Sequence, residues 1–186
     1  MSAIKIENLY FSYYGYVKPI FENVSFSFDT NWKIGLIGRN GIGKSTLFKL
    51  LLNQETYQGK ISKDVEFIKF PPNIINTSKL GIELYKELIS DEEEWKLFRE
   101  LNLLNVDKNL VYREFETLSK GEQTKILLAI LFTREDGFLL IDEPTNHLDM
   151  YGRKIVSEYL KRKKGFLLIS HDRDFLDGCI NHVISI

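Results

Sequence analysis

The sequence predicts an α/β fold built on a mostly parallel β-sheet, and three stretches carry that prediction. Two apolar runs, Phe138–Ile141 and Phe166–Ile169, have no polar interruption, as is typical of parallel strands buried on both faces. Helical patterns alternate with them along the chain. A glycine-rich loop, Gly38–Thr46, joins the apolar run Ile34–Ile37 to the helix-favouring segment Leu47–Leu52. In such folds, ligands bind at the carboxyl edge of the sheet.

The remaining strands are predicted from shorter patterns. Ile4–Leu9 and Val24–Phe28 alternate apolar and polar residues, as half-buried strands do. Short strands are expected at Lys60–Ile61 and Val65–Phe70, the second ended by Pro71 and Pro72. The last strand is expected at Val183–Ile186.

Helical periodicity begins in the middle of the chain. From Ile82 to about Leu104 the apolar residues recur at helical spacing, so we expect a small helical insert over about 74–117. The residues predicted to face inward are Ile82, Tyr85, Leu88, Ile89, Trp95, Phe98 and Leu101. Further helices are expected after Ser119, around Arg153–Leu160 and near Phe175.

Composition limits the class of protein. A chain of 186 residues, 44% hydrophobic and 27% charged, is ordinary for one soluble domain. No stretch reaches the roughly 20 apolar residues of a membrane span, and the start shows no secretory signal. The single Cys179 fits a reducing cytoplasm and is expected to be a buried small hydrophobe. A net charge of −1 argues against binding nucleic acid through overall charge.

The glycine-rich loop fits the pattern G-x-x-x-x-G-K-[ST], with Gly38, Gly43, Lys44 and Ser45 at the required positions. Its glycines allow backbone N–H groups to surround a phosphate, and the following helix directs its positive end at the same anion. Lys44 would reach the β- and γ-phosphates, and the Ser45 hydroxyl would bind Mg²⁺. A chance glycine turn before a lysine is the alternative, but the flanking strand and helix favour a nucleotide site.

Two carboxylates follow a predicted buried strand. Asp142 and Glu143 come directly after Phe138–Ile141, where phosphate-loop ATPases place an acid that holds Mg²⁺. Glu143 could then act as the general base toward water. Alternatively, the two acids before Pro144 could cap a helix or open a turn.

A third motif lies at Leu118–Gln123. Ser119 followed three residues later by Glu122 predicts a capping box at the start of a helix. The same helix start, with a serine and the Gly121 amide, could serve as a second anion site. The two interpretations are compatible.

The order of these motifs resembles that of an ATP-binding-cassette (ABC) ATPase domain. The motifs are G-x-N-G-x-G-K-S-T, then L-S-x-G-E-Q, then D-E-P-T-N-H-L-D, and a later strand ending in S-H-D. The resemblance covers essentially the whole chain, so it implies a single domain over 1–186. It also implies a phosphate-loop NTPase fold with an antiparallel β subdomain and a small helical subdomain.

The resemblance implies a role for each matching residue. Glu143 would be the catalytic base, His171 the switch histidine that contacts the γ-phosphate, and Asp149 a residue of the loop between two cassettes. Mg²⁺ would be held by Ser45 and Asp142. The signature, Leu118–Gln123, would contact ATP bound to an opposing domain. The residues implied to bind ATP are Tyr13, Gly38, Asn40, Gly41, Gly43, Lys44, Ser45, Thr46, Ser119, Gly121 and Glu122.

Tyr13 has alternatives, and two positions depart from the family pattern. An aromatic residue stacks on adenine in this family, and Tyr13 has the matching position, although Tyr14 or Tyr16 could serve and sheet packing would explain most of this cluster. Lys120 stands where the signature usually has glycine, so it either carries backbone strain at a positive φ or only adds charge near a phosphate. Pro72 stands where the family has a glutamine coupling the Mg²⁺ site to the helical subdomain.

The phrase Glu143–Asp149 resembles the ABC-F branch, whose members carry two ATPase domains on one chain and act on the ribosome, some protecting it from antibiotics. The resemblance implies a cytoplasmic protein without direct membrane insertion, of which this chain is the first cassette. The partner would be a second ABC domain, in the same parent chain or in a homodimer. The alternatives are the ATPase subunit of a membrane transporter and a module that binds ATP without hydrolysing it.

Overall fold

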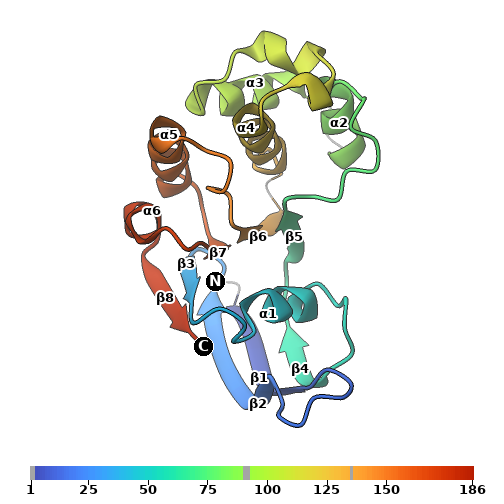
Figure 1. The fold of residues 1–186 in the computed structure, drawn as a ribbon, viewed down its shortest axis with the longest axis vertical. Coiled ribbons are helices and arrows are strands. Elements are labelled where there is room, and N and C mark those ends of the chain that lie inside the picture. Colours follow the sequence, from blue (N-terminus) through green and yellow to red (C-terminus); the bar gives the residue numbers. More distant parts are fainter. Residues whose placement is uncertain (1–2, 90–92, 135) are drawn as a thin grey trace.

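The computed structural model describes residues 3–89, 93–134 and 136–186. Two sheets and the helices packed on them form the fold (Figure 1). The predicted class is confirmed, because the larger sheet is parallel throughout and the smaller one is antiparallel.

The parallel sheet has the strand order β5-β6-β7-β3-β8. In chain order, its strands are β3 (Lys33–Ile37), β5 (Glu66–Phe70), β6 (Gly137–Asp142), β7 (Phe166–Ile169) and β8 (His182–Ser185). Asp142 at the end of β6 pairs with Ile169 at the end of β7, and β7 in turn pairs with β3. The chain segments that leave β3, β6 and β7 therefore meet at one edge of the sheet.

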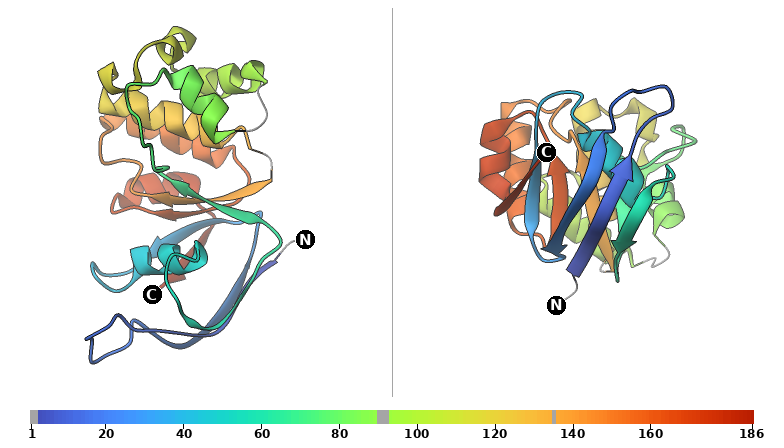
Figure 2. Two further views of the ribbon diagram at one scale, coloured as in Figure 1. Left: turned by 90° about the vertical axis from the view of Figure 1, so that its right-hand side faces the viewer. Right: turned by 90° about the horizontal axis from the view of Figure 1, so that it is seen from below.

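The antiparallel sheet has the order β2-β1-β4, formed by β1 (Ala3–Phe11), β2 (Phe21–Asp29) and β4 (Gln58–Ser62). Figure 2 shows this sheet and helix α1 (Lys44–Leu51) on one side of the parallel sheet. Phe138 and Leu140 of β6 point into the core on that side, whereas Leu139 and Ile141 point into the core under the other helices. This alternation places Asp142 on the same side as Leu140 and α1.

The other helices cover the opposite face. The helices of the segment between β5 and β6 gather at one end of the molecule in Figure 1: α2 (Gly81–Leu88), α3 (Glu94–Leu103), the 3₁₀ turns Lys108–Tyr112 and Phe115–Thr117, and α4 (Lys120–Leu131). Helices α5 (Met150–Lys161) and α6 (Arg173–Cys179) pack beside each other against the sheet. In the described part of the chain, no helix has the length and apolar character needed to cross a bilayer.

The predicted inward face of α3 is partly wrong. Trp95 is 56% exposed and carries the Arg99 guanidinium 5.4 Å from its ring centre. Leu101 is buried as predicted and Phe98 is partly buried, whereas the other buried residues of the helix are Leu97 and Glu100. Apolar spacing alone could not predict the burial of Glu100, because its partners Tyr159 and Lys163 lie far along the chain.

Cys179 behaves as expected for a small core residue. It is 2% exposed, and its thiol donates to the Phe175 carbonyl oxygen at 3.2 Å. Burial raises the pKa of this thiol to about 12, so it stays protonated at neutral pH.

Candidate active site

The glycine-rich loop turns from β3 into α1 and leaves the start of that helix open. Gly41 and Gly43 have φ values of 79° and 124°, which side chains with a Cβ rarely adopt. Gly43 is the N-cap, and no side chain caps the helix. The amide groups of the first turn therefore point out of the helix without a side-chain acceptor. This arrangement suits an anion.

Lys44 lies folded over the loop. The side chain is 8% exposed, and its ammonium donates to the carbonyl oxygens of Gly38 at 2.8 Å and Arg39 at 3.2 Å. Because these partners are neutral carbonyls, a nearby phosphate would be a stronger acceptor for the same ammonium group. The loop thus holds its cation close to the place that a phosphate would take.

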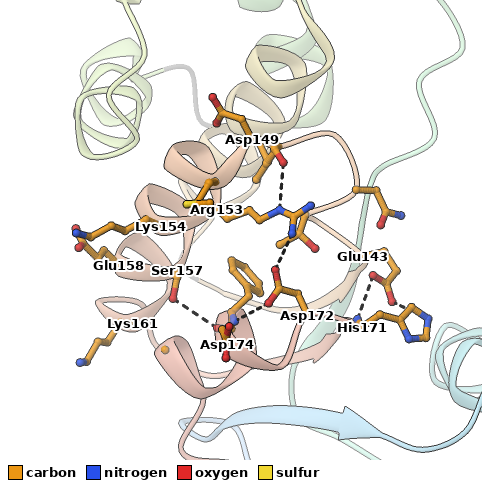
Figure 3. Close-up of a pocket in the computed structure, with 16 residues that line it drawn as sticks. Glu143, Asp149, Arg153, Lys154, Ser157, Glu158, Lys161, His171, Asp172 and Asp174 are labelled. Carbon is orange, nitrogen blue, oxygen red and sulfur yellow. Dashed lines mark hydrogen bonds and ion pairs between the residues drawn. The ribbon is translucent and has the colours of Figure 1, made fainter.

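Glu143 follows β6 in an unusual backbone conformation. Its φ is 48°, a left-handed value that costs energy in a residue with a Cβ. Its amide donates to the Ile169 carbonyl oxygen at 2.9 Å, which continues the pairing with β7. The turn directs the Glu143 side chain toward His171, the second residue after β7 (Figure 3). Strain of this kind is concentrated at functional sites.

The contacts of the Glu143 carboxylate leave one oxygen available. Oε2 accepts from the backbone N–H of His171 at 3.4 Å, and Oε1 lies 3.3 Å from His171 Nε2. Oε1 is nevertheless buried and has no hydrogen-bond partner of acceptable geometry. Buried polar atoms normally have a hydrogen-bond partner, so this oxygen can accept a hydrogen bond from a donor such as water.

Burial affects the titration of both acids at this edge. It raises the pKa of Asp142, while the positive charges of Lys69, His171 and Lys44 oppose the rise. Burial likewise raises the pKa of Glu143, opposed first by His171. A carboxylate with a raised pKa is a better proton acceptor once it is ionised.

One pocket of about 290 Å³ joins most of the predicted residues. It is lined by Asn40, Gly41, Gly43, Lys44, Ser45, Thr46, Asp142, Glu143, Ile169 and His171. A hydroxyl and a carboxylate, from Ser45 and Asp142, stand in the same pocket. Mg²⁺ prefers such oxygen donors, and it takes few of them from a protein because water and phosphate complete its shell. The donor set fits that ion.

Tyr13 lies beside this pocket. Its hydroxyl is 3.3 Å from the Thr46 hydroxyl, and its ring packs edge-on against Phe11 at 4.8 Å. Tyr14 and Tyr16 are 106% and 67% exposed. Of the three tyrosines, Tyr13 is therefore the one that contacts the phosphate-binding loop.

The signature residues do not line this pocket. Ser119 caps α4 and Glu122 completes the predicted capping box. Beyond glycine, the described residues with a positive φ are four asparagines and Glu143, so Lys120 starts the helix without that strain. Lys120 also lines a separate pocket of about 290 Å³ together with Pro71, Asp142 and Glu143. Pro71, which precedes Pro72, therefore lines the same pocket as both acids.

Two charged residues near the site were missed by sequence reasoning. Arg153 donates to the Leu148 carbonyl oxygen at 3.1 Å and pairs with Asp172 at 3.0 Å, which ties the loop before α5 to the loop after His171 (Figure 3). Lys69 of β5 lies on the neighbouring strand to Asp142 and contributes positive charge to it. No local pattern signals the Arg153–Asp172 pair or the Lys69–Asp142 interaction, because the partners are 19 or more residues apart.

Fold and site together define a phosphate-loop nucleotide-binding domain with a carboxylate and a histidine beside the loop. A family model described as "ABC transporter" matches residues 21–146. The chain therefore belongs to the ABC transporter family, as one of its ATPase domains.

Similarity to curated proteins indicates the branch of the ABC family to which the chain belongs. The chain is 28% identical over its full length to ABC transporter F family member 2 of Arabidopsis thaliana, of which it covers 28%. It is 31% identical over 88% of its length to the ribosome protection protein VmlR of Bacillus subtilis, covering 31% of that protein. It is 32% identical over its full length to the ATP-binding protein Uup of Buchnera aphidicola, covering 33%. These relatives support an ABC-F ATPase domain, and the chain spans about a third or less of their length.

Solved structures agree on the fold. A dimeric ATP-binding cassette in a post-hydrolysis state, bound to ADP and phosphate, matches 98% of this chain with a TM-score of 0.81 and 17% identity. The match covers 94% of that cassette.

Proposed function

We propose that this chain binds ATP with Mg²⁺ and hydrolyses it as one half of a two-cassette ABC-F protein. The observation that carries the proposal is the single pocket that combines Lys44, Ser45, Asp142, Glu143 and His171. Residues from three segments, following β3, β6 and β7, meet there. Each has the chemical character that phosphoryl transfer to water requires.

In this proposal the loop amides and Lys44 bind the β- and γ-phosphates. Ser45 and Asp142 would hold Mg²⁺, which would neutralise charge on the phosphate oxygens. Glu143 accepts a proton from water as the water oxygen bonds to the γ-phosphorus. The bond from that phosphorus to the bridging oxygen then breaks, and ADP and phosphate result. His171 orients Glu143 through its backbone N–H and contacts the γ-phosphate.

The site needs a second cassette to be complete. Ser119, Gly121 and Glu122 of the signature do not line the ATP pocket of their own chain, so they would contact ATP bound to another domain. The solved cassette with this fold is described as a dimer. We infer that the partner is another ABC domain, in the same parent chain or in a second copy. The isolated chain would then hydrolyse ATP weakly, with a rate that rises as the square of its concentration.

A ribosomal role is supported by the relatives. One of them is named as a ribosome protection protein and another as an ABC-F member. We propose a ribosome-bound cytoplasmic protein, acting as a translation factor or protecting the ribosome from antibiotics. The family description as a transporter makes the ATPase subunit of a membrane transporter the competing outcome.

Glu143→Gln in the full-length protein tests the chemistry. Removing the proton acceptor should lower phosphate release in a single-turnover assay by about 10²- to 10⁴-fold, the usual worth of a general base, while ATP still binds. Glu158→Gln, an exposed acid on α5, is the matched control. A Glu143→Gln protein that releases phosphate at the parent rate would remove Glu143 from the mechanism.

The same variant tests the partner. Held in its ATP-bound state, it should sediment with purified ribosomes in the presence of ATP and not of ADP. Recovery with a membrane-spanning partner, and none with ribosomes, would favour the transporter.

A further inference from the structure

A buried charge joins the helical insert to the core at a place remote from the ATP pocket. Glu100 of α3 is 1% exposed. Its Oε2 accepts a hydrogen bond from the Tyr159 hydroxyl of α5 at 2.7 Å and pairs with the Lys163 ammonium. Its Oε1 accepts from Arg99 at 3.1 Å. We call Glu100, Tyr159 and Lys163 the Glu100 cluster.

Aromatic packing surrounds these polar contacts. Phe132, the C-cap of α4, packs edge-on against Tyr159 with ring centres 5.5 Å apart. The Lys163 ammonium lies 4.4 Å from the Tyr159 ring centre and 5.2 Å from that of Phe132. The ends of α4 and α5 therefore converge on a residue of α3.

A cluster of this kind is an expensive way to hold two helices together. Each buried ion loses hydration, and apolar residues of similar volume often give equal or greater stability. What the cluster adds is a fixed orientation of the helices, since hydrogen bonds at fixed angles allow fewer arrangements than an apolar contact does. Burial lowers the pKa of Lys163, but the Glu100 carboxylate opposes the shift and favours the charged form.

The start of α4 lies close to the loop that precedes α5. A Cβ added to Gly121, near the start of α4, would lie 3.4 Å from the His147 carbonyl oxygen and 3.6 Å from the Leu148 side chain. Asp149 caps α5 immediately afterwards by accepting from the Gly152 amide at 2.7 Å. Helix α4 thus lies against the loop before α5 near the signature and contacts the Glu100 cluster, through Phe132, at its other end. A helix of 12 residues is a stiff link of about 18 Å.

We propose that the Glu100 cluster fixes the helical insert to α5, so that the signature and the loop before α5 move as one rigid unit. Glu100 is then a positioning residue for the composite ATP site, which rests on the proposed function. The resemblance implies, at the position of Pro72, a glutamine that would couple the insert to the Mg²⁺ site. The cluster supplies a different connection between insert and core, at the far side of the insert.

The first test measures the insert's orientation directly. Spin labels on cysteines replacing the exposed Lys60 of β4 and Lys108 of the insert report one core-to-insert distance in the full-length protein. Cys179 is buried and its thiol pKa is raised to about 12, so we expect it to react slowly with the label. The parent should give one narrow distance distribution, and Glu100→Gln a broader or displaced one. Glu158→Gln should match the parent, and a Glu100→Gln distribution that also matches it would overturn the proposal.

The second test separates positioning from stability. The pair Glu100→Leu with Lys163→Met replaces the ions by apolar groups and should unfold in urea at the parent midpoint or above it. We expect kcat of the full-length ATPase to fall about tenfold with KM for ATP unchanged, and the distance distribution to broaden. Lys164→Met is the control for the lysine. Parent kcat together with the parent distribution would leave the cluster a purely structural role.

The two tests also separate this proposal from the proposed function. If the parent protein hydrolyses no ATP, the proposed function fails, yet the distance distributions still decide whether Glu100 fixes the insert. If hydrolysis is normal and Glu100→Gln leaves the distances unchanged, only the Glu100 cluster proposal fails.

Discussion

Two helix starts in this protein both lie in motifs that bind phosphate in the family, and they are built in opposite ways. Helix α1 begins at Lys44 after Gly43, with no side-chain cap and no acid in its first turn. Helix α4 begins at Lys120 after Ser119, with a complete capping box and Glu122 in its first turn. The same position of the helix, the third residue, is Thr46 in α1 and Glu122 in α4.

The hydrogen bonds between Ser119 and Glu122 at the start of α4 have no counterpart at the start of α1. The Glu122 carboxylate accepts from the Ser119 amide at 2.8 Å and from the Ser119 hydroxyl at 2.7 Å, and the Glu122 amide donates to that hydroxyl at 3.3 Å. The start of α4 therefore already binds an anion, the Glu122 carboxylate, whereas the backbone N–H groups at the start of α1 have no side-chain acceptor. In the proposed function, the uncapped start of α1 can therefore bind a phosphate in the isolated chain. At the start of α4, a phosphate of the partner domain would have to displace the Glu122 carboxylate from Ser119.

The largest effect should come from removing the cation at the open helix start. Lys44→Met should weaken ATP binding about 10- to 100-fold, since charge-assisted hydrogen bonds contribute about 1.5–3 kcal/mol. Titration with a fluorescent ATP analogue measures it, and Lys60→Met on the exposed face of β4 is the control. Unchanged affinity would mean that the loop amides alone hold the phosphates, and the contrast with α4 would lose its main support.

A smaller effect is expected at the capped start. Ser119→Ala removes the cap and should lower the free energy of unfolding by about 1 kcal/mol, measured as a shift of the urea midpoint. Ser78→Ala, an exposed serine, is the comparison variant. A protein that loses ATPase activity but no stability would show that Ser119 serves the opposing nucleotide and adds nothing as a cap.

The smallest effect concerns the charge of Glu122. Hydrogen bonds from the Ser119 hydroxyl and amide lower the pKa of this carboxyl below its ordinary value of 4.5. An acid with a lowered folded-state pKa stabilises the fold above its unfolded-state pKa, and that contribution is lost as the pH falls through the folded-state value. Glu122→Gln should therefore be less stable than the parent at pH 7 by less than about 1 kcal/mol.

Unfolding curves at pH 7 and at pH 3 measure this difference, which should shrink at the lower pH. A gap of constant size across that range would assign it to the shape of the side chain and not to its charge.

Much of the fold and of the candidate site was predictable because short segments encode them. The strand–loop–helix around Gly38–Thr46, the capping box at Ser119 and the buried strand Phe166–Ile169 lie within a few residues of where the patterns placed them. In each, the contacts that define the structure join residues at most a few positions apart. The resemblance to ABC ATPase domains then assigned roles that such patterns cannot, and these roles remain predictions.

Other features had no local signal. Trp95 was expected inside and is exposed, while Glu100 was passed over and is buried. Sequence patterns predict that a charged residue is exposed unless its partner is known. The partner of Glu100, Lys163, lies 63 positions further along the chain. No sequence pattern predicts the positive φ of Glu143 either, because the surrounding strands impose it.

The sequence by itself determined which chemical groups this chain can bring to a nucleotide: a phosphate-binding loop, an acid pair after a buried strand and a histidine after another. Only the tertiary structure decided their relation to one another. The strand order places β6, β7 and β3 side by side, so groups about 100 residues apart in the chain share one pocket, and Ser119 lies outside it. The physical reason is that hydrogen bonding and periodicity are local, whereas strand order and the buried Glu100 cluster follow from packing the whole chain at once.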